Sequence, residues 1–356
     1  MKSYCKGLKI DATFIEKAIE RWSTAESGHD NYWRIEKEYG SRSILTIELL
    51  HEIKTRSLKF KPINYGNRQE SARKKERRIG QESVKQQIAN YIAVIALEDF
   101  LNARIGFYQV GSVKGKGPVF AKNTVENWTI EYGYWVHLDV KKCYQSIKHV
   151  DVMNILIKYI RNDDVLYICQ SLLDIYDKGL NIGSYFSLKI SQLIMSFGYH
   201  LVEDMHMTRR GKRIPLVTHQ IWYADDIYLF SPNKKNLRRA VLKLQGYMTY
   251  HFKFNFHDWK ISEIGRDEPV KIVGYTCAPE CTTLNSDLFL RIRKVYLRFD
   301  KKPTLHGAKS VCSYWGYLKH SNSYEVIQKY SFDRIFSKAK KYVSNHEKKR
   351  RCSTCR

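Results

Sequence analysis

The spacing of apolar and polar positions along the chain predicts where its helices and strands lie. Segments with apolar residues three or four positions apart are predicted to be amphipathic helices; they are 11–57, 81–103, a segment that begins near Ser187, 234–250 and most of 286–356. Runs rich in aromatic and β-branched residues are predicted to be strands; they lie before Asp139, across 217–230 and in two or three short stretches between 252 and 283. This order of elements predicts an α+β fold.

Two polar segments interrupt these elements. Residues 64–80 are polar and basic and contain the run from Arg73 to Arg78. Residues 111–118 hold three glycines and two lysines and are predicted to form a loop. The chain has neither an internal repeat nor a linker rich in proline, glycine and serine, so we expect its parts to pack as one unit.

The charge balance indicates a polyanionic partner. The chain carries 61 lysines and arginines against 36 aspartates and glutamates, a formal net charge of +25, and such an excess is typical of proteins that bind nucleic acid. Charge alone does not separate an enzyme from a ribosomal or chromatin-like binder or a soluble basic protein. With 356 residues, 43% of them hydrophobic and 27% charged, the chain is globular and long enough for two or three subdomains.

The sequence has no sign of a membrane segment or a secretory signal. No run of 18 apolar residues occurs, and the first residues lack the apolar core of a signal peptide. We therefore expect a cytoplasmic protein whose eight cysteines are mostly reduced thiols. Two cysteine pairs are closely spaced, Cys277 with Cys281 and Cys352 with Cys355. Four thiolates are able to bind one zinc ion, but the second pair lies in a basic tail, and we favour coincidence.

The most informative feature is a set of aspartates in strand-forming surroundings. Asp225 and Asp226 interrupt the apolar stretch 217–230, and Asp139 ends a similar run that begins at Tyr134. Aspartates are poor strand formers and costly to bury without a partner. Asp139 by itself is more typical of a turn or a helix N-cap, but together with the adjacent pair it indicates a site for divalent cations. Oxygen-only ligands favour two Mg²⁺ ions, with Mn²⁺ as a substitute, and in-line phosphoryl transfer.

Several segments resemble the sequence blocks of prokaryotic reverse transcriptases, in the same order. The catalytic and primer-grip blocks are matched by Asp139–Ile147, Gly179–Ser187, Tyr223–Asp226, Phe254–Lys260 and Ile272–Tyr275. Upstream, Lys75–Ile79 and the loop 111–118 resemble segments of the fingers, and downstream Ser313–His320 resembles a segment of the thumb. The resemblance spans about residues 60–325. Any single block is a weak signal, whereas this many in order are specific.

The resemblance implies a right-hand polymerase of the α+β class. Its parts would be an N-terminal helical region (1–60), fingers (61–133), a palm of antiparallel sheet and helices (134–285), and a helical thumb with a basic C-terminal tail (286–356). The implied catalytic residues and metal ligands are Asp139, Asp225 and Asp226, with the backbone of Val140 as a further ligand. The implied partners are an RNA template, a DNA product and deoxynucleoside triphosphates, and the sequence leaves oligomerisation open.

The resemblance also implies roles for residues around the carboxylates. Tyr144 would lie beside the sugar and exclude a 2′-hydroxyl. The other residues implied to bind nucleotide are Lys75, Arg77, Arg78, Lys85, Gly183 and Lys260. Those implied to bind template or primer are Lys114, Lys116, Gly179, Tyr223, Gly274 and Tyr275. Each of these residues also has a purely structural explanation. Tyr144 is explained as a core aromatic, the glycines as turn residues, and the lysines and arginines as part of a solvated surface.

The chain departs from the family pattern at two places. Gln86-Gln87 stands where relatives carry an Asp-Arg pair, so we predict that Lys85 replaces the missing arginine. Asn181-Ile182 stands where many relatives have Pro-Gln. We find no accessory blocks of retron enzymes, and we expect no endonuclease or maturase domain. The resemblance is therefore to stand-alone enzymes, which are the defence-associated and abortive-infection types or those of diversity-generating retroelements.

We therefore predict an RNA-templated DNA polymerase that copies a cognate non-coding RNA in an antiviral system. The alternatives are the enzyme of a mutagenic retroelement, an RNA-dependent RNA polymerase (disfavoured by Tyr144), and, from another class, a catalytically silent RNA-binding scaffold. An intact set of three aspartates in a chain of net charge +25 argues against the scaffold.

Overall fold

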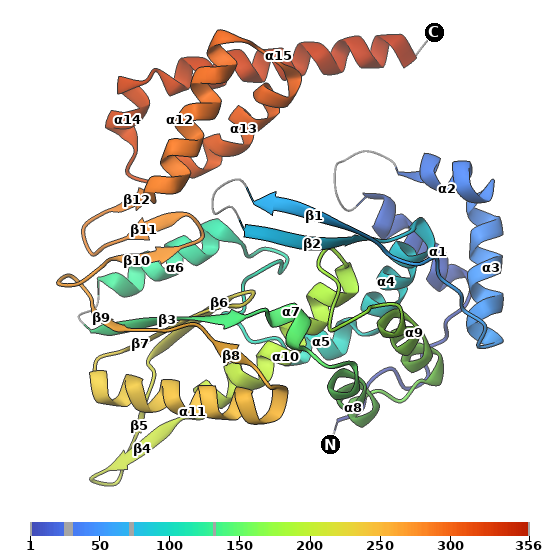
Figure 1. The fold of residues 1–356 in the computed structure, drawn as a ribbon, viewed down its shortest axis with the longest axis horizontal. Coiled ribbons are helices and arrows are strands. Elements are labelled where there is room, and N and C mark those ends of the chain that lie inside the picture. The colour runs from blue at the N-terminus through green and yellow to red at the C-terminus, as the bar shows by residue number, and fades with distance from the viewer. Residues whose placement is uncertain (1, 25–30, 71–74, 131–132, 355–356) are drawn as a thin grey trace.

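The computed structural model describes the whole chain except residues 1, 25–30, 71–74, 131–132 and 355–356. The described residues form helices and antiparallel strands in three contiguous parts (Figure 1): a helical N-terminal part, a central sheet between helices, and a C-terminal group of helices. The predicted α+β class is confirmed at this level. No helix among the described residues is long and apolar enough to cross a membrane.

The N-terminal part consists of α1 (Ala12–Thr24), α2 (Tyr32–Tyr39) and α3 (Arg42–Lys54). The helices predicted over 11–57 are therefore confirmed. The apolar face of α1 is buried through Ile15, Ala18, Ile19 and Trp22. At the start of α3, the Ser41 side chain accepts a hydrogen bond from the backbone N–H of Ile44 and caps the helix.

The polar segment 64–80 forms a hairpin that the sequence pattern did not reveal. Strands β1 (Asn64–Glu70) and β2 (Lys75–Gln81) pair antiparallel with each other and with no other described strand. The ribbon positions whose burial is described, 64–68 and 76–79, are exposed or half-buried on both faces, which accounts for the lack of alternation of apolar and polar residues in this sequence. The helix predicted over 81–103 is present as α4 (Val84–Ala96) and α5 (Glu98–Arg104), which are separated at Leu97.

The central sheet carries the strands predicted around the aspartates. Its order is β6 (His219–Tyr223), β7 (Asp226–Ser231), β3 (Tyr134–Lys141) and β8 (Asn255–Phe256), and β9 (Ile261–Glu263) also pairs with β3. All of these pairings are antiparallel. The predicted hairpin within 217–230 is thus confirmed.

Helices cover both faces of this sheet (Figure 1). On one face lie α10 (Tyr185–Glu203) and α11 (Lys234–Phe252), both close to their predicted positions, and they pack on Val136, Leu138 and Val140 of β3. On the other face lies α6 (Pro118–Thr129), a helix that the sequence pattern did not predict, packed with Trp135, Tyr228 and Phe230. The remaining elements of this part are α7 (Cys143–Ser146), α8 (His149–Tyr159), α9 (Asp163–Asp174), β4 (His206–Arg209) and β5 (Lys212–Pro215).

A small sheet leads into the C-terminal helices. It consists of β10 (Val270–Ile272), β11 (Tyr275–Cys277) and β12 (Thr282–Leu284). The helices are α12 (Ser286–Lys301), α13 (Leu305–Lys319), α14 (Tyr324–Lys329) and α15 (Phe332–Thr354). They enclose a core of their own that includes Ile292, Tyr296, Val311 and Phe332. The prediction of a helical region after residue 286 is confirmed.

Candidate active site

The three aspartates come together at one end of the central sheet. Asp139 of β3 lies directly opposite Asp226 of β7 in the antiparallel ladder. Side chains of directly opposed residues project from the same face, with Cβ atoms about 4.5–5.5 Å apart. Asp225 lies in the turn that joins Tyr223 of β6 to Asp226 of β7. Residues that are more than 80 positions apart in the chain (139 and 225) therefore share one site.

The backbone of this turn is unusual. Ala224 has a φ of 57°, and a positive φ at the first of the two central residues is typical of a type II′ hairpin turn, where glycine is the common residue. The loop before α6 packs against the turn, because a Cβ atom on Gly111 would lie 2.8 Å from the backbone nitrogen of Ala224. The same loop is hydrogen-bonded to β6: Val110 N–H donates to Trp222 O at 2.9 Å, and Trp222 N–H donates to Tyr108 O at 2.8 Å.

Burial and mutual repulsion raise the pKa of the Asp225 carboxyl. The largest cause is loss of water around this half-buried group, followed by the charges of Asp226 and Asp139, while the guanidinium of Arg77 acts in the opposite direction. The pKa of the Cys143 thiol is also raised, by its full burial and by the nearby Asp225 and Asp139, so the thiol stays protonated. A divalent cation would relieve the repulsion among the carboxylates.

Two histidines that the sequence interpretation did not include contact the aspartates. His137 Nε2 lies 2.7 Å from Asp226 Oδ1, and its ring stacks on Tyr228 with centroids 4.6 Å apart. His257 Nε2 lies 3.9 Å from Asp139 Oδ2, and the His257 backbone N–H donates to Asp139 O at 2.9 Å. The period of two along a strand places His137 on the same face as Asp139, and this signal was available in the sequence.

The carboxylates are chemically suited to magnesium, but they do not form a ready-made cluster. Among the described residues, no group of three or more histidine, cysteine, aspartate or glutamate side chains is arranged to hold a metal ion. One oxygen of Asp226 is already engaged by His137. Asp139 and Asp226 keep about 36% and 42% of their side-chain surface exposed, so both are accessible. Val140 lies opposite Phe256 of β8, and its role as a backbone ligand stays a prediction.

Tyr144 lies next to the aspartates, on the short helix α7. Burial raises the pKa of its hydroxyl, while the nearby Ser191 side chain acts in the opposite direction. The segment from Gly179 fixes this helix, because Leu180 N–H donates to Tyr144 O at 2.8 Å. Gly179 has a φ of 64°, and a Cβ atom there would lie 2.4 Å from the same carbonyl oxygen. The backbone contact with Tyr144 thus explains Gly179 without any nucleic acid; its predicted contact with the template stays a prediction.

Asn181 links the segment around Gly183 to the end of β2. Its side-chain oxygen accepts a hydrogen bond from Gly80 N–H at 3.1 Å, and its amide donates to Gly80 O at 3.2 Å. Gly183 is exposed and has a φ of 108°. Asn181 therefore ties the β1–β2 hairpin to the segment around Gly183.

The two arginines of β2 have different surroundings. Arg77 lies close enough to Asp225 and Tyr144 to influence the pKa of both. Arg78 forms an ion pair with Asp177 at 2.7 Å and stacks over the ring of Tyr65. Adjacent strand residues project to opposite faces, which accounts for this difference and favours Arg77 over Arg78 as a contact for a triphosphate. The side chain of Lys75 lies outside the described part of the structure.

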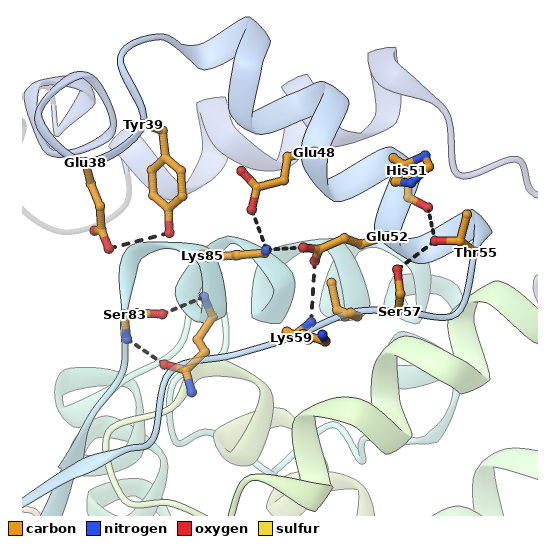
Figure 2. A network of polar contacts seen from close by, with 12 residues as sticks. Glu38, Tyr39, Glu48, His51, Glu52, Thr55, Ser57, Lys59, Ser83 and Lys85 are labelled. Atoms are coloured by element: carbon orange, nitrogen blue, oxygen red, sulfur yellow. Dashed lines mark hydrogen bonds and ion pairs between the residues drawn. The ribbon is translucent and has the colours of Figure 1, made fainter.

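Two lysines that were predicted to bind nucleotide have other partners. Lys85 is buried, and its Nζ lies 2.6 Å from Glu48 and 2.7 Å from Glu52 of α3, as Figure 2 shows. It joins α4 to α3, and this burial and pairing argue against its replacing the missing arginine. Lys260 is exposed and pairs with Glu268 at 2.7 Å. In the block Phe254–Lys260, the basic side chain that approaches the carboxylates is that of His257, which lies near Asp139.

Some of the residues predicted to contact template or primer are accessible, and others are buried or have partners within the protein. Lys114 is exposed on the loop before α6, whereas Lys116 lies over the ring of Phe107 and its Nζ bonds to Phe107 O, with its pKa lowered by burial. Tyr223 is half-buried at the edge of the site. Tyr275 is only 1% exposed and packs on Tyr317, so the prediction that its ring contacts nucleic acid disagrees with its burial.

Gly274 and the cysteine pairs have structural explanations. Val273 and Gly274 both have positive φ, 43° and 93°, in the turn between β10 and β11, as a type I′ hairpin turn requires. Cys277 is buried, with a raised pKa of about 11, and Cys281 is exposed. The side chains of Cys352 and Cys355 lie outside the described residues, so the zinc alternative stays untested.

Comparison with known proteins identifies the family. The family model described as "Reverse transcriptase (RNA-dependent DNA polymerase)" matches residues 66–277, a range that contains all three aspartates, Tyr144 and Arg77. A search of curated proteins finds no match to the chain. The matched range covers more than half of the 356 residues, and the chain belongs to the reverse transcriptase family of RNA-directed DNA polymerases.

Proposed function

We propose that the aspartates at the end of the central sheet hold two Mg²⁺ ions and that this site joins deoxynucleotides on an RNA template. The observation that carries the proposal is the direct pairing of Asp139 with Asp226, with Asp225 in the adjoining turn. Asp139 and Asp225 would be the main ligands, because one oxygen of Asp226 already contacts His137. When bound, the two ions activate the primer hydroxyl and neutralise the charge of the leaving pyrophosphate.

The surrounding residues would orient the substrates. Arg77 has the guanidinium geometry that suits a phosphate group and lies near Asp225. Tyr144, whose backbone carbonyl accepts a hydrogen bond from Leu180 N–H, would present its ring to the sugar and exclude a 2′-hydroxyl. His137 would keep Asp226 in one orientation. We also propose the right-hand arrangement, with residues 61–133 as fingers, 134–285 as palm and 286–356 as thumb.

Primer extension on a generic RNA template with Mg²⁺ tests the proposal. We expect the wild-type protein to incorporate deoxynucleotides in preference to ribonucleotides, and Asp225→Asn to abolish synthesis while its affinity for RNA stays largely intact. The matched control is Asp204→Asn, an exposed aspartate at the C-terminal end of α10, which should leave synthesis unchanged. Full synthesis by Asp225→Asn would contradict the proposed site.

We further propose that the template in the cell is a cognate non-coding RNA of an antiviral system. The support is the resemblance to stand-alone defence-associated enzymes. Sequencing of nucleic acid that co-purifies with the protein is the test. We expect one recurrent RNA together with its complementary DNA, whereas a dispersed set of RNAs would contradict a cognate template. Copies with many mismatches to their template would favour the mutagenic retroelement instead.

A further inference from the structure

A cavity of about 400 Å³ lies between the N-terminal helices and Tyr144, and residues 183–185 also line it. Trp22 of α1 and Arg34 of α2 form one side, and Gln87 and Tyr91 of α4 form another. Tyr144 and Gly183 also line it, and these residues are proposed to contact the incoming nucleotide. The cavity therefore adjoins the place where a template base would pair with that nucleotide.

Trp22 and Arg34 of the N-terminal helices are joined to Gln87 of α4 by hydrogen bonds and to each other by a cation–π contact. The Gln87 side-chain oxygen accepts hydrogen bonds from Trp22 Nε1 at 3.0 Å and from Arg34 Nη1 at 3.4 Å. The Gln87 amide donates to Glu82 O at 2.8 Å, which fixes its orientation. The Arg34 guanidinium lies over the Trp22 ring, 5.4 Å from its centroid. A planar guanidinium held in this way offers a flat face on which a base can stack.

Another part of the cavity lining is unsuited to a phosphate group. Glu82 also lines the cavity, and its carboxyl group accepts hydrogen bonds from Asn90 at 2.5 Å, Tyr176 at 3.2 Å and Asn181 at 3.3 Å. Among the residues that line the cavity, Arg34 is the basic side chain and Glu82 the acidic one, and burial raises the pKa of the Glu82 carboxyl. Tyr91 and Tyr185 add a stacked aromatic pair, with centroids 4.5 Å apart. The residues that line this cavity include aromatic rings and side-chain amides but no lysine. Such a lining favours a base over a phosphate group.

A second, more basic cavity shares the residues Tyr185 and Leu188 with the first. It has a volume of about 790 Å³ and is lined by Lys114, Lys116 and Lys189, with Arg21 and Glu98 among its other lining residues. Lys189 Nζ donates to Ser112 O at 3.0 Å, which joins α10 to the loop before α6. An alternation of basic and aromatic surface is typical of sites that follow a single strand, with phosphates on the lysines and bases on the rings.

We propose that the cavity between the N-terminal helices and Tyr144 holds an unpaired base of the RNA template, before that base reaches the active site. This inference rests on the proposed function, since it assumes a template strand in the adjoining site. The helices α1 and α2, which lie outside the range matched by the reverse transcriptase family, then take part in template binding through Trp22 and Arg34.

The test compares two primer–template pairs by equilibrium binding. In one, the RNA template extends about six nucleotides beyond the primer, and in the other it ends at the first unpaired base. We expect wild-type protein to bind the longer overhang more tightly by about 5- to 100-fold, the range that stacking of a base provides. Arg34→Ala should remove most of this ratio. Arg34→Gln, which keeps a donor for Gln87 but loses the guanidinium, should do the same and covers the case in which Arg34→Ala does not fold.

The matched control is Arg42→Ala. Arg42 lies over the ring of Tyr32, 4.0 Å from its centroid, but it lines a different cavity of the N-terminal part. It should leave the overhang ratio unchanged. An overhang ratio near one in the wild type, or an unchanged ratio in both Arg34 variants, would overturn the inference even if DNA synthesis proceeds. Loss of the ratio in Arg42→Ala would also overturn it, whereas absence of DNA synthesis with an intact ratio would count against the proposed function alone.

Discussion

The proposed role of Asp225 in the reaction comes with a cost to the stability of the fold. The Asp225 carboxyl is half-buried and lies near the charges of Asp226 and Asp139, and both effects raise its pKa. The strained φ of the neighbouring Ala224 adds to the same site. A group whose pKa is higher in the folded than in the unfolded state stabilises the fold below its unfolded pKa, and this contribution is lost as the pH rises.

We therefore expect Asp225→Asn to stabilise the metal-free protein at neutral pH, by about 0.5–2 kcal/mol. The difference from wild type should shrink as the pH falls through the raised pKa of Asp225, because protonation then removes the wild-type charge. Thermal unfolding in a chelating buffer at neutral and at acidic pH measures this. Added Mg²⁺ should stabilise wild type more than the variant. An Asn variant that is less stable than wild type at neutral pH would show that the repulsion is already relieved.

At the scale of elements, Lys85 determines how α4 is joined to α3. Its ammonium group is buried between Glu48 and Glu52 of α3, whereas Arg77 of β2 faces Asp225. The resemblance implied the same role for both residues, because Arg77 lies in a fingers block and Lys85 stands beside Gln86-Gln87, where relatives carry an arginine. Their partners separate them, because one cation holds two helices together and the other faces the proposed site.

We expect Lys85→Ala to lower the free energy of unfolding by about 1–3 kcal/mol, because it removes the cation that pairs with the partly buried carboxylate of Glu52. The KM for deoxynucleotides should stay within roughly twofold of wild type. Denaturant unfolding and steady-state kinetics are the measurements. Lys54→Ala is the matched control: Lys54 also pairs from α3, with Asp164 at 2.6 Å, but it is half-exposed, so its loss should cost about 0–1 kcal/mol. A large rise in KM for Lys85→Ala would restore the nucleotide-binding role.

At the scale of the whole molecule, the net charge of +25 is partly carried by the basic helices at the C-terminal end, α12 and α15. The C-terminal helices lie on the side of the molecule opposite the β4–β5 hairpin (Figure 1). Both regions carry exposed basic residues, including Lys294 and Arg298 on α12 and Arg209 and Lys212 on the hairpin. If the C-terminal helices contact a template–primer duplex, only the first pair should matter for binding.

We expect the double substitution Lys294→Ala and Arg298→Ala to reduce the slope of log affinity against log salt concentration by about 2, which is roughly 0.9 per lost phosphate contact. The double substitution Arg209→Ala and Lys212→Ala removes the same charge from the hairpin and should leave the slope unchanged. Titrations of a primer–template duplex at several salt concentrations supply both slopes. Equal slopes for the two variants would mean that net charge, rather than this surface, governs binding.

The sequence by itself determined the features that are local in the chain. The periodic helices, the hairpin around Asp225 and the strand that ends near Asp139 follow from short-range spacing and from the cost of placing aspartates in apolar strands. The ordered blocks were enough to indicate the family that residues 66–277 match. The exposed β1–β2 ribbon was missed because, without a buried face, it has no alternating pattern.

Only the tertiary structure decided which distant residues meet. The pairing of Lys85 with Glu48 and Glu52, of Lys260 with Glu268, and of His137 with Asp226 depends on the packing of separate elements. A lysine on a surface and a lysine in a buried ion pair look the same in a sequence, because their difference lies in desolvation and in partners that the fold brings near. For the same reason the burial of Tyr275 and the cavity lined by Trp22 and Arg34 became visible only in three dimensions.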